Sequence, residues 1–459
     1  MRLKSLVSLL PLLITLPVGN AQAEVYESTY SPLPSQATLI TNATILTGTG
    51  ERLDDASLLI EDGKISFVGE GQAPDGVTTI DASGQWVTPG LIDVHSHLGV
   101  YASPGVKAHS DGNEMTNPAT PNVWAEHSVW PQDPGFSRAL AGGITTLQAL
   151  PGSGNLIGGR GVTLKNVYSN SYQGMKFPDA PHGLKMACGE NPKRVYGDRK
   201  QMPSTRMGNM AAYRAQWIAA QKYVEDWAAY EKKAADEEAN GNNDAKAPKR
   251  DLKLETLAAV LKGEILVHMH CYRADEMLTI LDMSKEFGYK VTAFHHGVEA
   301  YKIADKLAEN NVCGALWADW WGFKMEAYDG IQENIAIVDR PEGGCAIVHS
   351  DSGEGIQRLN QEAAKAMTRG NLAGMDIPPE HAIKWITSNA AKSLGVGDRT
   401  GSLEAGKMAD VVIWNGNPFS VYAKAGQVFI DGALVYDRDN PDLQPVSDFE
   451  LGQLQGVSK

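Results

Sequence analysis

The chain has 459 residues, of which 42% are hydrophobic, and it carries a formal net charge of −14 at pH 7. This length and apolar content exclude a disordered or fibrous protein and predict a large core in more than one domain. The acidic balance argues against nucleic acid as a partner and favours an enzyme that acts on a small molecule.

Residues 1–23 have the pattern of a secretory signal peptide. Two basic residues precede an apolar run over 6–18, and Ala-Gln-Ala at 21–23 offers a cleavage site of small residues. We therefore expect the mature chain to begin near residue 24 and to be exported, either to the periplasm or out of the cell. The apolar run is short for a membrane span and no later segment is long enough, so no spanning helix is predicted.

Residues 24–88 and 398–459 are both rich in predicted β-strands. Between 36 and 80, short apolar runs alternate with turns, and Glu61-Asp62-Gly63-Lys64 is a strong hairpin signal. Near the other end, runs at 409–414 and 427–435 are β-like, with a turn at Asp431-Gly432. Two β-rich ends around a different middle predict one small β-sandwich domain built from both termini.

Residues 89–397 alternate strand-like runs with amphipathic stretches, which is typical of βα units around a parallel sheet. Seven strand candidates are readable, at 90–94, 144–150, 184–189, 265–268, 290–294, 312–316 and 345–348. Their number and spacing predict an α/β fold, a (β/α)8 TIM-like barrel. Residues of about 201–263 interrupt this pattern with a long segment rich in Ala, Glu, Lys and Trp, interpreted as a helical insertion on the surface.

The four cysteines, Cys188, Cys271, Cys313 and Cys345, each lie in a short apolar run. In an exported chain they could form two disulfides. We expect instead that they are free, small residues that fill space in buried strands.

His95 and His97 are the first candidate metal ligands. They follow the apolar run 87–94, and histidines two positions apart on a strand point the same way, which suits two imidazoles on one ion. Glu190, His270, His296 and Asp351 also follow strand candidates, where barrel enzymes place catalytic groups. These nitrogen and oxygen ligands suit two divalent metal ions, with Zn²⁺ favoured, Mn²⁺ or Fe²⁺ as alternatives, and a single ion left open.

Two histidine positions have a neighbouring rival. His268 shares a strand face with His270 but lies earlier on the strand, so we interpret it as a residue behind the ligands. His295 and His296 face opposite ways, and His296 is chosen because it stands at the strand end.

The order of these motifs resembles the amidohydrolase superfamily, and within it the chain looks closest to the imidazolonepropionase-related exported amidohydrolases. The motifs are Pro-Gly-Leu-Ile-Asp-x-His-x-His at 89–97, His270, His296-Gly297, Ser350-Asp351, Thr-Ser-Asn-Ala-Ala-Lys at 387–392 and the segment 401–410. The resemblance covers nearly all of the mature chain except the insertion. It implies that His95, His97 and Asp351 bind the more buried metal, that His270 and His296 bind the second, and that Asp351 also handles protons.

The bridge between the two metals departs from the common pattern of this superfamily, in which many members use a carboxylated lysine. Lys185 begins its strand candidate and is expected to point to the barrel bottom, whereas Glu190 ends it. Glu190 is therefore the predicted bridging carboxylate.

The predicted activity is hydrolysis of a carbon–nitrogen amide bond by a metal-activated water, with Asp351 accepting the proton and returning it to the leaving nitrogen. The candidate substrate contacts are Arg160, Arg194, Tyr196, Arg273, Trp321 and Lys324. These cations favour a substrate with a carboxylate, a dipeptide or an N-acyl amino acid, although some could simply pair with neighbouring acids. The alternative substrate is a cyclic amide such as a lactam or an imidazolone. A second alternative is an inactive periplasmic metal-binding protein, which we expect to have lost at least one ligand position, and none is lost in this sequence. A homo-oligomer is left open.

Overall fold

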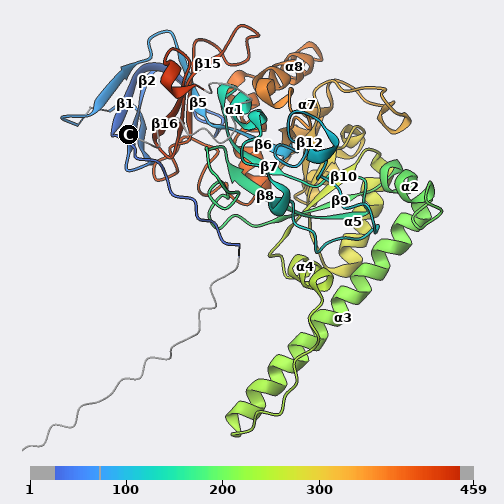
Figure 1. Cartoon of the computed structure of the whole chain (residues 1–459). Coiled ribbons are helices and arrows are strands. Elements are labelled where there is room, and N and C mark those ends of the chain that lie inside the picture. Colours follow the sequence, from blue (N-terminus) through green and yellow to red (C-terminus); the bar gives the residue numbers. More distant parts are fainter. Residues whose placement is uncertain (1–25, 72–73, 445–459) are drawn as a thin grey trace, which may run out of the picture.

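The computed structural model of the chain describes residues 26–71 and 74–444 (Figure 1). The predicted signal peptide lies outside the described residues. Among the described residues, no helix combines the length and the apolar character that a membrane span requires.

Eight strands form the barrel sheet, and strands that follow one another in the chain are neighbours in the sheet. They are β6 Leu91–Ser96, β7 Ile144–Ala149, β8 Ile157–Lys165, β9 Gly183–Ala187, β10 Leu266–Cys271, β11 Val291–His296, β12 Cys313–Leu316 and β13 Ala346–Val348. Just beyond β13, the Asp351 amide donates a 3.0 Å hydrogen bond to the carbonyl of His95 in β6. This bond brings the last strand back to the first, as a TIM-like barrel requires.

The barrel confirms the predicted fold class and adds one strand that the apolar pattern did not reveal. That strand is β8, which runs antiparallel to both β7 and β9. Glycines at 158, 159 and 161 break its apolar run. The link from β7 is a short hairpin, which can join only antiparallel strands, whereas parallel neighbours need a long crossover.

Helices connect the strands and cover the barrel. They are α1 Pro134–Ala141, α2 Glu190–Gly197, α5 Ala274–Phe287, α6 Ala304–Glu309, α7 Asn334–Asp339, α8 Leu359–Leu372, α9 Pro379–Ala382 and α10 Ser388–Ser393. In α5, Met277, Ile280, Leu281 and Ser284 are buried, and this spacing of three and four residues forms one face against the sheet. The helix ends at Gly288, whose left-handed conformation (φ 78°) is a common helix stop.

Short 3₁₀ helices also occur in the described part of the chain. They are Lys107–His109, Ala125–Ser128, Ala300–Ile303, Met325–Ala327, Ile356–Arg358, Ile383–Ile386 and Pro441–Leu443. The one at Met325–Ala327 lies in the long segment between β12 and α7, which reaches the candidate site described below.

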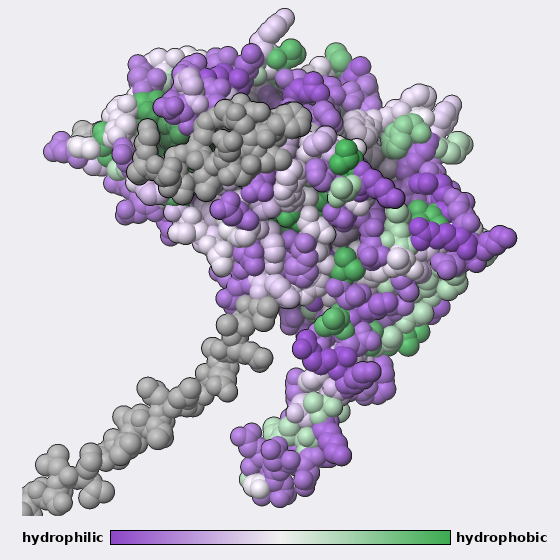
Figure 2. Space-filling view, in the orientation of Figure 1, coloured by the Kyte–Doolittle hydropathy of each residue, from purple (hydrophilic) through white to green (hydrophobic). Residues whose placement is uncertain are grey.

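The residues predicted as a helical insertion form α3, Arg206–Ala239, and α4, Leu252–Leu261. Figure 1 shows α3 projecting from the barrel as an arm, with the chain returning beside it to α4. The buried residues of α3 end at Tyr223, so only its first half packs against the body. The tip of the arm is mostly hydrophilic (Figure 2).

A second sheet combines strands from both ends of the chain, and we call it the terminal sheet. Its strands are β1 Thr38–Leu46, β2 Arg52–Glu61, β3 Lys64–Gly69, β4 Thr78–Asp81, β5 Trp86–Pro89, β14 Val411–Trp414, β15 Ala425–Ile430 and β16 Ala433–Asp437. The order is β16-β15-β14-β5-β1-β2-β3, with β4 beside β1. Because β5 pairs with β14, the two ends of the chain share one apolar core.

A buried ion network joins the barrel to the terminal sheet. Lys165, at the end of β8, lies 3.1 Å from a carboxylate oxygen of Asp410 and 2.9 Å from one of Asp431. All three side chains are buried, and Thr400 adds a 2.7 Å hydrogen bond to Asp410. Breaking such a network leaves an unpaired buried charge at a cost of about 3–5 kcal/mol, so it holds the two parts in a fixed arrangement.

The prediction of free cysteines is wrong. Cys188 is bonded to Cys271 and Cys313 to Cys345, and no described cysteine is left free. The reason lies in strand pairing, since β9 is followed by Cys188 beside β10, and β12 lies beside the start of β13. The Cα atoms of the two pairs are therefore only 5.2 and 4.6 Å apart.

Replacing both Cys313 and Cys345 by Ala is expected to lower the free energy of unfolding by about 3–5 kcal/mol, because the disulfide closes a loop of 32 residues. Urea unfolding followed by circular dichroism measures this change. The matched control is the wild-type protein treated with a reductant, which should show a loss at least as large. An unchanged unfolding midpoint in both samples would contradict the prediction.

Candidate metal centre

His95, His97 and Asp351 form a compact group of possible metal ligands at the end of β6. The Nε2 atoms of His95 and His97 lie 3.4 and 3.1 Å from Oδ1 of Asp351. On the other side of its ring, His97 directs Nδ1 to the carbonyl of Leu150 at 2.8 Å, which fixes Nδ1 as the donor and leaves Nε2 with a free lone pair. One ligand atom from each residue lies within 4.8 Å of the others, as a shared divalent ion requires.

A second group consists of His95, His296 and His349, again with ligand atoms within 4.8 Å of one another. Both ring nitrogens of His349 and Nδ1 of His296 are buried without a hydrogen-bond partner. Such orphaned atoms are costly unless something else satisfies them, and an ion would do so. His349 was not among the predicted ligands, although its spacing of two from Asp351 repeats that of His95 and His97.

His270, at the end of β10, lies beside this second group without belonging to it. Its ring centroid is 4.7 Å from that of His296, and its Nε2 lies 3.3 Å from the amide nitrogen of Asn191. Its Nδ1 has no partner among the described residues. The structure therefore brings four predicted ligands, His95, His97, His296 and Asp351, into contact, with His270 next to them.

Lys185 lies at the histidines, and the expectation that it points to the barrel bottom is wrong. It is the third residue of the short strand β9, and its side chain is long enough to bring Nζ to 3.3 Å from Nε2 of His95. Nζ also donates a 3.0 Å hydrogen bond to the carbonyl of Pro151. Burial lowers the pKa of Lys185 to about 8.

Glu190, the predicted bridge, lies apart from both ligand groups. The chain turns at Gly189, with φ at 75°, and Glu190 then begins α2. Its carboxylate lies 3.9 Å from Nζ of Lys324 and its side chain is 25% exposed. Glu190 thus belongs to neither ligand group, whereas Lys185 reaches His95.

A series of hydrogen-bonded, buried histidines lies behind His95. Nδ1 of His95 lies 2.8 Å from Nδ1 of His295, and Nε2 of His295 lies 2.8 Å from Nδ1 of His268. If Nε2 of His95 is to face an ion, its Nδ1 must carry the proton and donate it to His295. His295 and His268 therefore fix the tautomer of His95, in keeping with the position behind the ligands predicted for His268.

Two residues of the site adopt left-handed backbone conformations that side chains rarely favour. The φ angles are 74° for His296 and 49° for Asp351. For residues other than glycine this conformation costs about 1–2 kcal/mol, and it persists where surrounding contacts impose it. His296 is the last residue of β11 and Asp351 lies three residues beyond β13, and their side chains approach to 3.8 Å.

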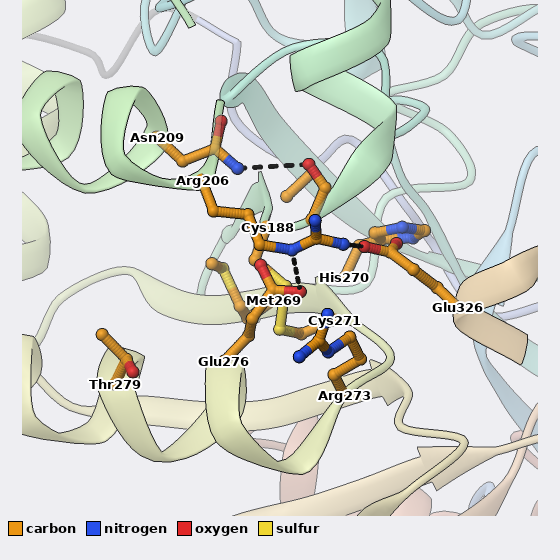
Figure 3. Close-up of a disulfide and its surroundings, with 12 residues drawn as sticks. Cys188, Arg206, Asn209, Met269, His270, Cys271, Arg273, Glu276, Thr279 and Glu326 are labelled. Carbon is orange, nitrogen blue, oxygen red and sulfur yellow. Dashed lines mark hydrogen bonds and ion pairs between the residues drawn. A yellow bond between two sulfur atoms is a disulfide. The ribbon is translucent and has the colours of Figure 1, made fainter. Parts of the chain in front are cut away.

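One disulfide and one arginine hold the segments around His270 (Figure 3). The Cys188–Cys271 bond ties the residue after β9 to the residue after His270. Arg206, the first residue of α3, donates to Glu276 at 2.9 Å and also pairs with Glu326. Glu326 in turn accepts a 3.0 Å hydrogen bond from the amide of Glu190, so the root of the arm is connected to the rim of the site.

Lys324 and Trp321 are the predicted substrate contacts that lie at this rim. Nζ of Lys324 donates a 3.0 Å hydrogen bond to Oδ1 of Asn191 and lies 4.0 Å above the ring of Tyr272. The ring of Tyr272 is 5.7 Å from that of His296. Trp321 lines a pocket that includes His296.

Three of the other predicted substrate contacts are engaged elsewhere, while the charge of Arg194 acts on Lys324 at the rim. Arg160 lies within β8 rather than past a strand end, and it binds Thr256 at 2.9 Å. Arg273 forms two 2.9 Å hydrogen bonds with Asp275. Tyr196 is buried and donates to the carbonyl of residue 117, while Arg194 is exposed on α2.

Comparison with known proteins gives consistent similarities. Residues 341–446 match the model of the Amidohydrolase family. The chain is 36% identical to an amidohydrolase of known structure from Thermotoga maritima MSB8, covering 87% of this chain and 100% of that one, with a TM-score of 0.77. It is 33% identical over 437 residues to Amidohydrolase tasK of Hapsidospora irregularis, where it spans 43% of the relative's length. It is 24% identical to an imidazolonepropionase of Mesorhizobium japonicum, covering 79% of this chain and 87% of that protein.

Metal-free protein is expected to lose stability below pH 6.5. Burial lowers the pKa of His268 and of His349 to about 3, so between pH 6.5 and 3 the unfolded chain binds protons that the folded chain refuses. Burial raises the pKa of Asp93 to about 6, which acts in the opposite direction but as a single group. The net expectation is that the free energy of unfolding falls by about 1 kcal/mol or more for each unit by which the pH drops below 6.5.

Urea unfolding of EDTA-treated protein at pH 7.5, 6.5 and 5.5 measures this slope. His268→Gln should make the slope shallower, while the same change at the exposed His127 should leave it unaltered. A free energy of unfolding that stays constant or rises towards pH 5.5 would contradict the assignment of neutral buried histidines.

Proposed function

This chain belongs to the amidohydrolase superfamily, and we propose that it is a metal-dependent hydrolase that cleaves the C–N amide bond of a dipeptide or an N-acyl amino acid. The observation that carries the proposal is the convergence of His95, His97, His296 and Asp351 at one end of the barrel. The Nδ1 atoms of His270 and His296, which are buried without a hydrogen-bond partner, support a metal there.

The proposed centre holds two divalent ions, with Zn²⁺ favoured for nitrogen-rich ligands. His95, His97 and Asp351 would hold one ion, and His270 and His296 the other. We propose Lys185, as a carboxylated side chain, in place of Glu190 as the bridge, because its Nζ is the group that reaches His95. Ions bound there would supply water activation near neutral pH and polarisation of the amide carbonyl.

Asp351 is placed to move the proton of the reaction. Its Oδ1 faces His95 and His97, and its Oδ2 lies 3.8 Å from Nε2 of His296. Burial raises the pKa of this carboxyl, but the interactions with His97, His349 and Lys185 together outweigh burial and leave the pKa below its usual value. The carboxylate is therefore ionised at neutral pH and is proposed to accept a proton from water and deliver it to the leaving nitrogen.

Lys324 is proposed to bind the carboxylate of the substrate. Its ammonium group lies at the rim next to Asn191 and His270, and its side chain is mostly shielded from solvent. A partly desolvated cation attracts a carboxylate more strongly than a fully solvated one does. Glu190, at 3.9 Å, partly balances this charge when no substrate is present.

The two disulfides support the proposal that the chain works outside the reducing cytosol. Bonds such as Cys188–Cys271 and Cys313–Cys345 form and persist in exported proteins and are rare in cytosolic ones. The proposed substrate is accordingly one that the enzyme meets after export.

Metal-loaded protein is expected to hydrolyse members of a library of dipeptides and N-acyl amino acids, and Asp351→Asn is expected to lower kcat by about 10²–10⁴-fold through loss of proton transfer. Amine release measures the rate. Asp376→Asn is the matched control, because Asp376 has a similar left-handed backbone (φ 50°) and is exposed. Activity on lactams or imidazolones alone would replace the proposed substrate class, and wild-type rates for Asp351→Asn would refute the role of Asp351.

Lys185→Ala is expected to reduce bound metal from about two ions per chain to about one, whereas Glu190→Gln should leave the metal content unchanged. The reason is that Nζ of Lys185 lies 3.3 Å from His95, whereas the carboxylate of Glu190 lies 3.9 Å from Lys324. Elemental analysis of the purified variants measures the stoichiometry. Loss of a metal in Glu190→Gln with full occupancy in Lys185→Ala would reverse the assignment.

A further inference from the structure

A pocket of about 290 Å³ opens beside His296, between the end of β11 and the segment that joins β12 to α7. The lining residues that matter here are Trp317, Trp320, Trp321, Ile331, Asp319 and Asn334. Its volume is near the lower limit of small-molecule sites, about 300 Å³, and suits one side chain rather than a whole large ligand. Because His296 is part of its wall, whatever occupies the pocket lies next to the proposed metal centre.

Stacked aromatic rings form the inner wall of this pocket. The ring of Trp317 stacks on His296 with centroids 4.2 Å apart, and Trp320 stacks on Trp317 at 4.7 Å. Both pairs are nearly parallel, at 23° and 14°. A flat ring that enters the pocket can extend this stack, since aromatic groups gain free energy from such offset contacts.

The polar side chains of the lining are mostly occupied by other partners. Both carboxylate oxygens of Asp319 accept hydrogen bonds from Lys365 at 2.9 Å. Asn334 donates to the carbonyl of Gly297 at 2.9 Å and accepts from the amide of Tyr301 at 2.8 Å. No charged group of the lining is left to receive a charged side chain, so the pocket favours an uncharged occupant.

The same segment also leaves large apolar side chains unusually exposed. Trp320 and Trp321 are 41% and 59% exposed, and Phe323, Met325, Tyr328 and Ile331 are exposed as well. Apolar side chains that gather on one short segment mark a binding surface, whereas isolated ones do not. Three of these side chains, those of Trp320, Trp321 and Ile331, line the pocket that also includes His296.

We propose that this pocket selects the side chain of the substrate and takes an aromatic ring or a large aliphatic group. The enzyme would then act on dipeptides or N-acyl derivatives of amino acids such as phenylalanine, tryptophan or leucine. This rests on the proposed function for the identity of the scissile bond. Lys324 lies over Tyr272, which stacks on His296, and Trp317 of the pocket also stacks on His296. Because an amino acid carries its carboxylate and its side chain on one carbon, Lys324 can bind the carboxylate while the pocket takes the side chain.

The first test measures binding without turnover. The free amino acids L-phenylalanine, L-alanine and L-glutamate are titrated into the metal-loaded wild-type enzyme by calorimetry. L-phenylalanine is expected to bind at least about tenfold more tightly than L-alanine, because a buried apolar side chain contributes discrimination of this size. Equal binding of the two, or tighter binding of L-glutamate, would overturn the pocket proposal.

The second test compares variants of the pocket. Trp321→Ala and Ile331→Ala are each expected to reduce the preference for L-phenylalanine over L-alanine in binding, and Trp320→Ala is expected to reduce it about tenfold. The ratio of kcat/KM for N-acetyl-L-phenylalanine to that for N-acetyl-L-alanine should fall in the same variants. Tyr422→Ala, which removes an 85% exposed aromatic ring outside this segment, is the matched control and should change neither ratio.

The outcomes separate this inference from the proposed function. If small N-acyl amino acids are hydrolysed and no aromatic preference exists, the pocket proposal fails while the proposed function stands. If L-phenylalanine binds selectively and no amide is hydrolysed, the pocket proposal stands and the proposed function fails. A preference that survives in all three pocket variants would place the selective site elsewhere and refute the inference.

Discussion

The closing contact of the barrel determines the geometry of the candidate metal centre. The amide of Asp351 donates to the carbonyl of His95, while the buried carboxylate of Asp93 accepts hydrogen bonds from the amides of His95 and Ser350 and from the hydroxyl of Ser350. The same contacts that return β13 to β6 therefore place Asp351 against His95 and His97. A barrel that failed to close would lose its ligand set together with its fold.

This closure gathers an unusual density of buried imidazoles. Burial lowers the pKa of His95, His270 and His296, and the neighbouring lysines and histidines lower it further, so the rings are neutral and their lone pairs are available. Metal ligation needs neutral imidazole. The desolvation that makes the metal-free cluster sensitive to acid is thus the same property that prepares it for an ion.

Sequence patterns predicted the parts of this arrangement that depend on local spacing, such as the paired histidines of β6, the β-rich ends and the barrel. They failed where the outcome depends on strand register or side-chain reach. Cys188 meets Cys271 only because β9 and β10 are neighbours. Lys185 lies early on β9, yet its four-carbon stem reaches His95, whereas Glu190 follows the strand end, begins α2 and lies 3.9 Å from Lys324.

The root of the helical insertion is connected to the rim of the candidate site by several side chains of α3, among them Asn209, which donates a 3.1 Å hydrogen bond to the carbonyl of Gly189, and Arg206. Arg206, the first residue of α3, joins Glu276 of α5 to Glu326, and Glu326 stands in the β12–α7 segment that also carries Trp321 and the pocket. That segment exposes several apolar side chains, and its one regular element is the 3₁₀ helix Met325–Ala327, so side-chain bonds such as the Arg206–Glu326 pair help to hold it in position. The first half of α3 packs against the body and holds Arg206 in place, and through Glu326 this arginine is joined both to the β12–α7 segment and to the amide of Glu190.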